Sequence, residues 1–325
     1  MFDARRKRIG REMAIAAFGV SPDRFDPWVL DRFTDIVEEE HVQAGQVLWP
    51  AGHVVETLYF MQEGHVKGTR RGAPPWTFHG RWFLGAFEGH LDRPATRSLV
   101  ALSDFYALKF GRAAWLDLLE DSFDVTRRAV TAAATAVALL DERLPMVERP
   151  APPRVILRAA DGLVGGRPSP ADGSLTMVER IAFFTEVGMS LNVGVQALAD
   201  LANVSKDLSV KPGASVFDSG EANDHFFLVV DGEVEATRKD PDVRRRYAPG
   251  EVVTGAAALS ERRAHWAARA VGSARLLAVP IEAWFDLTEE HFELASSTLA
   301  VFAQYRERIL DQLAAEAGPE GIVLT

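Results

Sequence analysis

The residues of this sequence best able to do chemistry are its eight histidines, because the chain contains no cysteine. Histidine serves as metal ligand or general base, but both uses need partners at suitable spacing. Seven of the eight are too widely spread for a His-x-His pair with a following Glu: His53, His65, His79, His90, His225, His265 and His291. No Gly-rich phosphate loop, nucleophile elbow or His-Glu-x-x-His helix accompanies them. We therefore expect no metal site, no cofactor and no enzyme, and a metal-dependent barrel enzyme ranks last among our interpretations.

Two groups of side chains could instead bind another molecule. One is basic and combines Arg244, Arg245 and Arg246 with the preceding Arg238 and Lys239. It could face an acidic protein, or it could be an ordinary solvated hairpin. The other group is aromatic, and tryptophan in an exposed loop is costly unless it packs or binds. Its members are interaction candidates or core residues: Trp76, Phe78 and Trp82.

The chain contains one stretch twice, and the aromatic and basic groups lie at or after the ends of the two copies, at corresponding positions. Residues 43–71 read QAGQVLWPAGHVVETLYFMQEGHVKGTRR, and residues 211–239 read KPGASVFDSGEANDHFFLVVDGEVEATRK. Three glycines coincide at a shift of 168 residues: Gly45, Gly52 and Gly64 with Gly213, Gly220 and Gly232. Each glycine answers a backbone requirement for a positive φ or a close approach, so the coincidence indicates two copies of one unit.

Length, charge and composition narrow the function. The 325 residues suffice for two domains, each with its own core. A formal charge of −10 argues against nucleic acid as the main partner, because duplex binding depends on neutralising phosphates. We find no apolar run long enough to span a membrane, and the absence of cysteine suits a reducing compartment. We therefore expect a cytoplasmic protein without a membrane or nucleic-acid partner.

The hydrophobic pattern predicts two domains of mainly β structure with flanking helices. Asp26 can cap a helix that begins at Pro27, and the short apolar segments after Gln43 alternate with turn residues, as in a sandwich or small barrel. We predict five parts: a basic N-terminal extension (1–26), a first domain (27–144), a Pro- and Gly-rich linker (145–175), a second domain (176–316) and a C-terminal tail (317–325), which we expect to be mobile.

The two quoted stretches resemble the opening strands of the cyclic-nucleotide-binding homology domain, as in the sensor domains of the catabolite activator protein and of protein kinase A regulatory subunits. Each has a Gly before its first strand, a Gly in the next turn, and an aromatic strand that leads into an acidic-Gly turn. The resemblance covers about 240 residues and implies two tandem jelly-roll β-barrels. It also implies a ligand cassette, in which a Phe-Gly-Glu helix start holds the cyclic phosphate and ribose and a later Arg grips the phosphate.

Both copies of the cassette lack its two ligand-binding side chains. The first reads LGAFEGHLDRPATRSLVA and keeps Gly85, but Ala86 stands at the Glu position and Ala95 at the Arg position. The second reads TGAAALSERRAHWAARA and shows the same loss: Gly255 is kept, Ala256 stands at the Glu position, and Ala264 or His265 at the Arg position. Losing both contacts could cost about 3–5 kcal/mol, enough to turn a micromolar site into a millimolar one.

Two arginines could supply charge for another anion. Arg97 lies two residues beyond Ala95, and Arg263 has the same separation from His265. Residues two apart on a strand point to the same side, although both arginines could equally be surface cations.

We therefore favour a non-catalytic regulatory or scaffold protein that acts through protein contacts and has lost cyclic nucleotide binding. The alternative is a sensor that binds a cyclic (di)nucleotide or another anion in a non-standard pocket. We expect no DNA-reading helix-turn-helix after the last helix, which should run from Phe292 to about Ala315. Its Leu299, Phe302, Ile309 and Leu313 keep 3-4 spacing around Arg306, which fits packing on its own barrel or a homodimer seam.

Overall fold

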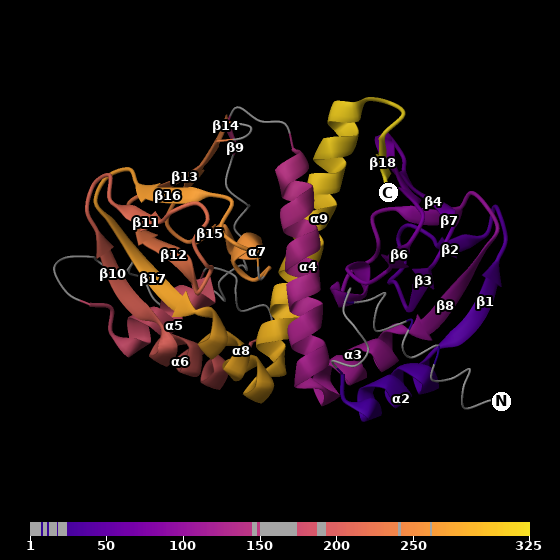
Figure 1. Ribbon diagram of the computed structural model, residues 1–325, viewed down its shortest axis with the longest axis horizontal. Coiled ribbons are helices and arrows are strands. Elements are labelled where there is room, and N and C mark those ends of the chain that lie inside the picture. The colour runs from indigo at the N-terminus through magenta and orange to yellow at the C-terminus, as the bar shows by residue number, and fades with distance from the viewer. Residues whose placement is uncertain are drawn as a thin grey trace. The chain divides into compact units, whose positions relative to one another are not determined.

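The chain folds into two compact units (Figure 1). A computed structural model describes residues 25–144, 148–149, 174–186, 193–239, 242–260 and 262–325, with Arg8, Glu12 and Phe18. Most of the predicted N-terminal extension and linker therefore lies outside the described residues. The first unit comprises residues 1–133, 139–144 and 302–325, and the second comprises residues 134–138 and 145–301.

The first unit is built from two sheets with helices at their ends. Its strands are β1 (Glu38–Val42), β2 (Val47–Trp49), β3 (Thr57–Met61), β4 (His65–Arg70), β5 (Ala73–His79), β6 (Trp82–Leu84), β7 (Ser98–Ala101), β8 (Phe105–Gly111) and β18 (Ile322–Leu324). Its helical elements are α2 (Pro27–Ile36), η2 (Glu88–His90), α3 (Arg112–Asp121), most of α4 (Phe123–Arg143) and the part of α9 (Phe292–Ala317) after Val301. The strand orders are β1-β8-β3-β6 and β18-β5-β4-β7-β2.

The second unit repeats this plan. Its strands are β9 (Glu148–Arg149), β10 (Lys206–Val210), β11 (Ser215–Phe217), β12 (His225–Asp231), β13 (Val234–Lys239), β14 (Asp242–Tyr247), β15 (Val252–Val253), β16 (Ala267–Ala270) and β17 (Ala274–Pro280). Its helices are α5 (Met177–Glu186), α6 (Val195–Val204), α7 (Gly255–Ala258) and α8 (Ile281–Glu290), with the start of α9. The orders β10-β17-β12-β15 and β9-β14-β13-β16-β11 match those of the first unit. The predicted fold class, mainly β and jelly-roll-like with flanking helices, is confirmed.

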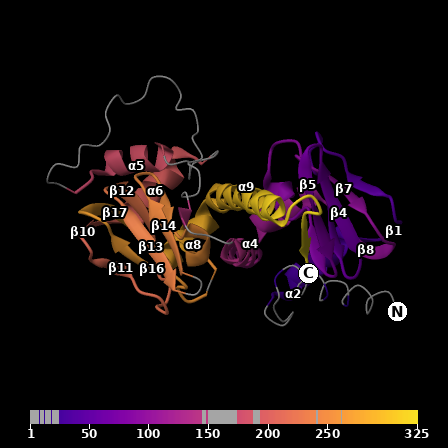
Figure 2. The same ribbon diagram turned by 90° about the horizontal axis from the view of Figure 1, so that it is seen from above.

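The strand register shows which residues correspond between the units. Gly68 of β4 pairs with Trp76 of β5 and Leu99 of β7. In the second unit Ala236 of β13 pairs with Arg245 of β14 and Ala268 of β16. Corresponding residues of the two units are therefore 168 positions apart up to β4 and β13, and 169 apart from β5 and β14 onward. The sequence comparison could not locate this one-residue insertion. Figure 2 shows the neighbouring strands β4, β5 and β7 of the first unit.

Close backbone approach explains why one glycine recurs in the repeat. A Cβ atom on Gly232 would lie 2.3 Å from the carbonyl oxygen of Ser273. A Cβ atom on Gly64 would lie 2.9 Å from the side chains of Met61 and Phe105. Both glycines also have positive φ values, +152° and +78° for Gly64 and Gly232. Only glycine fits this turn without a shift of its neighbours, so the turn keeps the hairpin geometry in both units.

The predicted helix start at Pro27 is confirmed, because the Asp26 side chain accepts a hydrogen bond of 2.9 Å from the Trp28 amide. The last residues differ from the predicted tail. Ile322–Leu324 form β18 (Figure 1), and this strand pairs in parallel with residues 76–78 of β5. Ile322 and Leu324 are buried there while Val323 points outward, so burial of alternate apolar residues fixes the strand.

The last helix, α9, runs to Ala317, and its residues from Phe302 onward pack in the first unit. Phe302, Ile309 and Leu313 are buried in the chain, as is Arg306 between them. These side chains therefore do not form an open seam. The homodimer through this helix stays a prediction, because these side chains are already buried within one chain. None of the described helices combines the length and apolar character that a membrane crossing needs.

Candidate functional site

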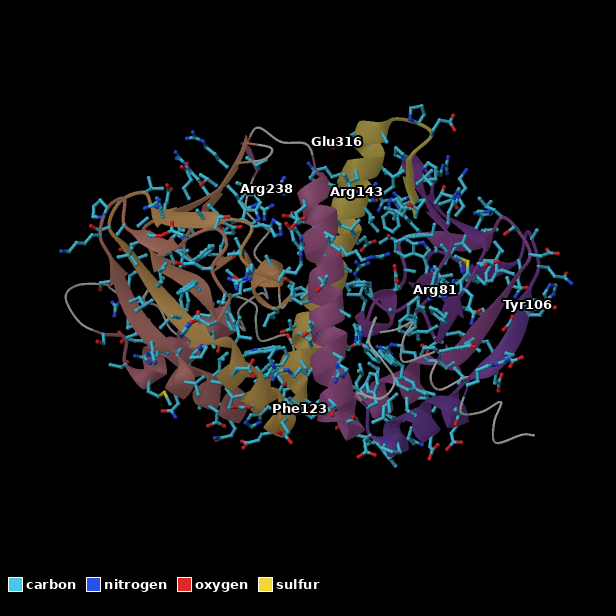
Figure 3. All side chains as sticks on the ribbon, in the orientation of Figure 1. Arg81, Tyr106, Phe123, Arg143, Arg238 and Glu316 are labelled. Atoms are coloured by element: carbon cyan, nitrogen blue, oxygen red, sulfur yellow. The ribbon has the colours of Figure 1, made fainter. Side chains whose placement is uncertain are left out.

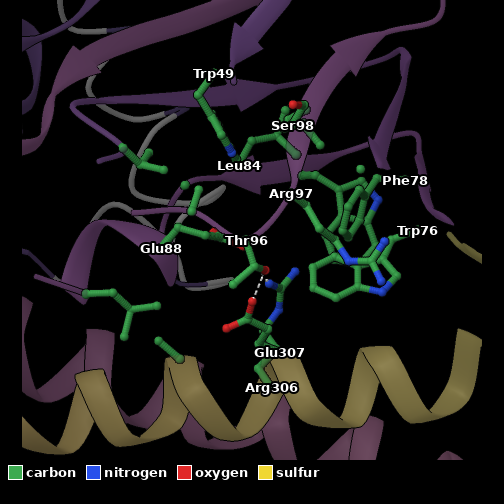
Figure 4. Close-up of a pocket in the computed structure, with 18 of the residues that line it drawn as sticks. Trp49, Trp76, Phe78, Leu84, Glu88, Thr96, Arg97, Ser98, Arg306 and Glu307 are labelled. Carbon is green, nitrogen blue, oxygen red and sulfur yellow. Dashed lines mark hydrogen bonds and ion pairs between the residues drawn. The ribbon is translucent and has the colours of Figure 1, made fainter. Parts of the chain in front are cut away.

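A pocket in the first unit lies between β5, β7, the η2 region and the second half of α9 (Figure 4). Aromatic side chains form much of its wall, and arginines and glutamates project into it: Trp49, Trp76, Phe78, Trp82, Phe83, Glu88, Arg93, Arg97, Arg306 and Glu307. Its volume is about 40 Å³, which leaves room for a few water molecules and none for a nucleotide. Side chains of α9 also line it: Ala303, Arg306 and Glu307.

Arg97 is the central cation of this pocket. It immediately precedes β7, and it is only 4% exposed, with its guanidinium 4.2 Å from the centre of the Trp76 ring. Nη1 donates to the Pro74 carbonyl oxygen at 2.8 Å, and Nη2 donates to Asp311 Oδ1 at 2.6 Å. The side chain is thus held by a cation–π contact, a backbone acceptor and a carboxylate. The structure places this predicted residue inside the pocket.

Two carboxylates of α9 occupy the basic side of the pocket. Asp311 accepts from Arg97 and also from Arg70 Nη2, at 2.8 Å. Glu307, one helical turn earlier, accepts a hydrogen bond from the Thr96 hydroxyl (Figure 4) and another from the Arg93 guanidinium. Residues four apart lie on one face of a helix, so both acids point to the same side, Asp311 towards Arg97 and Arg70 and Glu307 towards Arg93. The helix therefore presents negative charge to the part of the pocket that an anionic ligand would need.

An arginine of α9 completes the filling. Arg306 is 7% exposed, and its Nη1 donates to Glu88 Oε1 at 3.2 Å. Its guanidinium lies 4.6 Å from the Phe87 ring centre and 5.7 Å from that of Phe78. The pocket thus encloses matched ionic pairs between the helix and the sheets, in surroundings where an unpaired charge would be costly.

The cassette backbone is present in the first unit. Gly85 has a φ of +85°, and its carbonyl oxygen accepts from the Gly89 amide at 2.7 Å; the short 3-10 helix η2 follows where the resemblance implies an α-helix. Ala86 begins this turn, and Ala95 exchanges backbone hydrogen bonds with Gly52 and His53. Neither alanine has a polar side chain to offer, as the sequence indicates.

His90 closes this turn without adding charge. Burial, together with the smaller effect of the nearby Arg112 charge, lowers the pKa of His90 to about 4. The neutral imidazole is therefore the form at neutral pH, and its Nδ1 has no hydrogen-bond partner among the described residues. Arg112 donates from Nε to the Gly89 carbonyl oxygen at 2.6 Å, which fixes the turn beside it.

The structure corrects our alignment of the second cassette. Leu84 pairs with Tyr59, and Val253 pairs with Phe227, so the residue that corresponds to Gly85 is Thr254, not Gly255. Thr254 has a φ of +50°, and it is the one non-glycine residue with a positive φ in the described chain. The second unit thus keeps the positive φ of Gly85 at a threonine. Because the sequence comparison looked for a glycine, it matched the neighbouring Gly255 instead.

The ambiguity at the second Arg position is also resolved. Ala264 exchanges backbone hydrogen bonds with Gly220 and Glu221, as Ala95 does with Gly52 and His53, so Ala264 is the counterpart of Ala95. The other predicted residues turn to local partners. Arg263 donates to the Gly220 carbonyl oxygen at 2.8 Å, and His265 Nε2 lies 2.9 Å from Arg262 Nη2. Ala256 lies in the short helix α7.

The second unit carries the cation–aromatic contact with its residue types exchanged. By register, Arg245 corresponds to Trp76 and Trp266 to Arg97. The Arg245 guanidinium lies 5.3 Å from the Trp266 ring centre, and that of Arg238 lies at the same distance. Both arginines are buried. Both units therefore contain an arginine against a tryptophan, but the arginine precedes β7 in the first unit and lies in β14 in the second.

The proposed interaction residues divide between surface and interior. Trp76 and Phe78 are 5% and 3% exposed, so they are not the exposed hot spots we considered, because they pack in the pocket. Trp82 is half-buried and donates to the His79 carbonyl oxygen at 3.0 Å. Arg244 and Arg246 point outward near Glu235, with side chains 62% and 56% exposed, whereas Arg245 between them is buried. Strand alternation splits the basic cluster.

Sequence analysis missed the acids that fill the pocket. Glu307 and Asp311 lie four residues apart beside the apolar face of α9, with Arg306 adjacent. This spacing was a usable signal, but it does not reveal that the helix packs on β5 and β7. Within the described part of the chain, no cluster of histidine and acidic side chains could hold a metal ion.

Part of the second unit is similar to a known family. Residues 207–291 match the family model described as "Cyclic nucleotide-binding domain". The match supports the resemblance stated from the sequence for the second unit, and the matched segment includes β12 to β17 and the second cassette. A comparison with curated proteins gives no match.

Solved structures that are similar to this chain at TM-scores of 0.32 to 0.36 include two regulatory proteins of protein kinase A and one cyclic nucleotide binding protein. The regulatory domain of protein kinase A from Toxoplasma gondii, crystallised with cAMP, is 13% identical, with 88% of this chain and 93% of that chain covered and a TM-score of 0.32. A regulatory subunit of a cAMP-independent protein kinase A from Trypanosoma brucei is 12% identical, with 91% and 87% covered and a TM-score of 0.33. A putative cyclic nucleotide binding protein from Ruegeria pomeroyi is 21% identical, with 43% and 63% covered and a TM-score of 0.36. These values do not bear on function.

Proposed function

We propose that this chain is a non-catalytic regulatory protein that acts through protein contacts and whose first cyclic-nucleotide-binding-like unit is closed by its own helix α9. The observation that carries the proposal is the set of ionic contacts from Glu307 and Asp311 to Arg93, Arg97 and Arg70. A nucleotide phosphate would have to replace these carboxylates, and the pocket supplies neither a cassette glutamate for the ribose nor a cassette arginine for the phosphate. A cytoplasmic location is part of the same proposal.

Isothermal titration of the purified chain with cyclic AMP and cyclic GMP tests this proposal. We expect no heat of binding up to about millimolar nucleotide, since the two lost contacts are worth about 3–5 kcal/mol together. The Glu307→Ala/Asp311→Ala variant is the matched probe, because it opens the pocket without restoring the cassette. Micromolar binding of either nucleotide to the wild-type chain would contradict the proposal.

A second candidate function rests on two buried donors. Arg97 Nε and Trp76 Nε1 lie in the pocket wall without a hydrogen-bond partner among the described residues. Buried donors are normally satisfied, so a small anion or another acceptor could bind between them. This is the sensor alternative, with a ligand smaller than a nucleotide. Thermal shift against inorganic anions and nucleotides would separate the two, because a shift that Arg97→Met abolishes favours the sensor.

A further inference from the structure

The surface that receives α9 is a continuous acceptor for a peptide segment. We call residues 302–324 the docking segment, and we call β5 with Arg70, Arg93, Thr96 and Arg97 the acceptor groove. The docking segment contacts the groove in two ways: its helical part through the carboxylates of Glu307 and Asp311, and its strand β18 through parallel pairing with β5. The first contact provides charge complementarity and the second provides main-chain pairing, the mode of β-strand addition.

The sequence of the docking segment fits this groove closely at one glycine. Gly321 has a φ of +71°, and a Cβ atom there would lie 1.9 Å from the Pro75 carbonyl oxygen. Any other residue would have to move away from β5, so this position tolerates only glycine. Immediately after it, Ile322 and Leu324 are buried while Val323 is half exposed. The groove thus selects a helix with acids four residues apart, followed by Gly-apolar-x-apolar.

The second unit has a strand edge that is occupied in the same way. The strand β9 follows helix α4 and pairs in parallel with β14 at Arg244 and Arg245. β14 is the counterpart of β5, since Arg245 corresponds to Trp76. In both units, therefore, the central hairpin leaves one strand edge that accepts a short parallel strand from a segment that follows a long helix. An unpaired edge of this kind readily pairs with another chain.

We propose that the acceptor groove is a docking site for residues 302–324 of a second copy of this chain, with the chain's own segment as its resident occupant. A second copy offers identical acids, the same glycine and the same strand, so exchange creates no new unpaired group, as in domain swapping. The tethered segment has a high effective concentration, so exchange needs a weakened internal contact. This inference rests on the function proposed above, because it identifies a second copy of this chain as one of the protein partners.

Complementary charge reversals test the exchange on the full chain. Variant one carries Arg70→Glu, Arg93→Glu and Arg97→Glu, which reverse the three groove arginines that pair with the docking segment. Variant two carries Glu307→Arg and Asp311→Arg in the docking segment. Each variant repels its own segment, but a mixture can pair every acid with an arginine through reciprocal exchange. We expect monomers from each alone and a one-to-one heterodimer from the mixture by native mass spectrometry.

A mixture of folded variants that stays monomeric up to about 100 μM would overturn the inference, with circular dichroism reporting the folding of each. A labelled peptide of residues 302–325 added to variant two gives a second measurement that needs no folded variant one. We expect saturable binding in fluorescence anisotropy, weakened at least tenfold by Gly321→Val in the peptide. Equal binding of both peptides, or none, would also overturn it. Neither result bears on nucleotide binding, so failure here leaves the titration test of the proposed function intact.

Discussion

The two units build the same pair of sheets and differ in how they fill the space beside the cassette. In the first, Arg97 stacks on Trp76 and meets the carboxylate of Asp311. In the second, Arg245 and Arg238 lie against Trp266. Counted from the helix starts at Phe123 and Phe292, the residue of α4 that corresponds to Glu307 of α9 is the buried Ala138. The comparison teaches that the fold conserves a cation–aromatic contact, while the acids that close the pocket belong to α9.

The largest expected effect comes from forcing one unit to adopt the arrangement of the other. Trp76→Arg alone places two guanidinium groups together in a buried site and should destabilise the first unit by about 3–5 kcal/mol. Adding Arg97→Trp reproduces the order found in the second unit and should recover at least about 1 kcal/mol. Amide hydrogen exchange of peptides from β4 and β5 measures the unit by itself. If the two substitutions destabilise the first unit additively, the cation–aromatic contact is not interchangeable between the units, and the comparison is contradicted.

The next effect concerns the acid that the second unit lacks. Asp311→Ala leaves Arg97 buried with its backbone acceptor only, and it removes the partner of Arg70. We expect a loss of about 1.5–3 kcal/mol in the free energy of unfolding of the first unit. Glu316→Ala is the matched control on the same helix, because Glu316 is exposed (Figure 3), and it should change stability by less than about 0.5 kcal/mol. Equal effects of the two substitutions would contradict the account.

A pH difference between the units follows from His90, whose counterpart by register is the buried Leu259. The folded pKa of about 4 lies below the ordinary value of 6.5, so only the unfolded chain takes up a proton as the pH falls between them. Stability is therefore present above about pH 6.5 and is lost towards pH 4, by at most about 2 kcal/mol at pH 5.

Denaturant unfolding at pH 7 and pH 5, read by hydrogen exchange in each unit, measures the His90 effect. We expect the first unit to have a lower free energy of unfolding at pH 5 than at pH 7. His90→Leu should remove the part of this loss that the imidazole causes. The second unit has no such imidazole, so its peptides should not show this part of the loss. An unchanged pH dependence in the His90→Leu chain would show that this imidazole is not the cause.

The smallest effects are expected at the outward arginines of β14. Arg244→Ala and Arg246→Ala remove exposed pairs with Glu235 and should each cost at most about 0.5 kcal/mol. Arg245→Ala, between them, removes a buried side chain that contacts Trp266 and should cost several times more. Thermal unfolding of the three variants gives the ranking. Similar values for all three would mean that strand alternation does not separate surface from interior here.

Much of the fold could be predicted from the sequence, because glycine spacing and short apolar segments are local signals. The duplicated stretch, the helix start at Pro27 and the loss of the cassette side chains at Ala86 and Ala95 are of this kind. The match of Gly255 to Gly85 was wrong because Thr254 adopts the left-handed conformation that normally indicates glycine. The strand β18 and the acids of α9 could not be predicted, because their roles depend on contacts with residues more than 200 positions away.

The most direct test of the central claim is a cross-link between the docking segment and its groove. The chain contains no cysteine, so Thr77→Cys with Val323→Cys introduces the only two thiols, at positions that pair between β5 and β18. A short thiol-to-thiol cross-linker at low protein concentration should join them within one chain, seen by peptide mass spectrometry. If the two thiols instead react independently and no internal cross-link forms, the first unit is not closed by its own helix and strand, and the account fails.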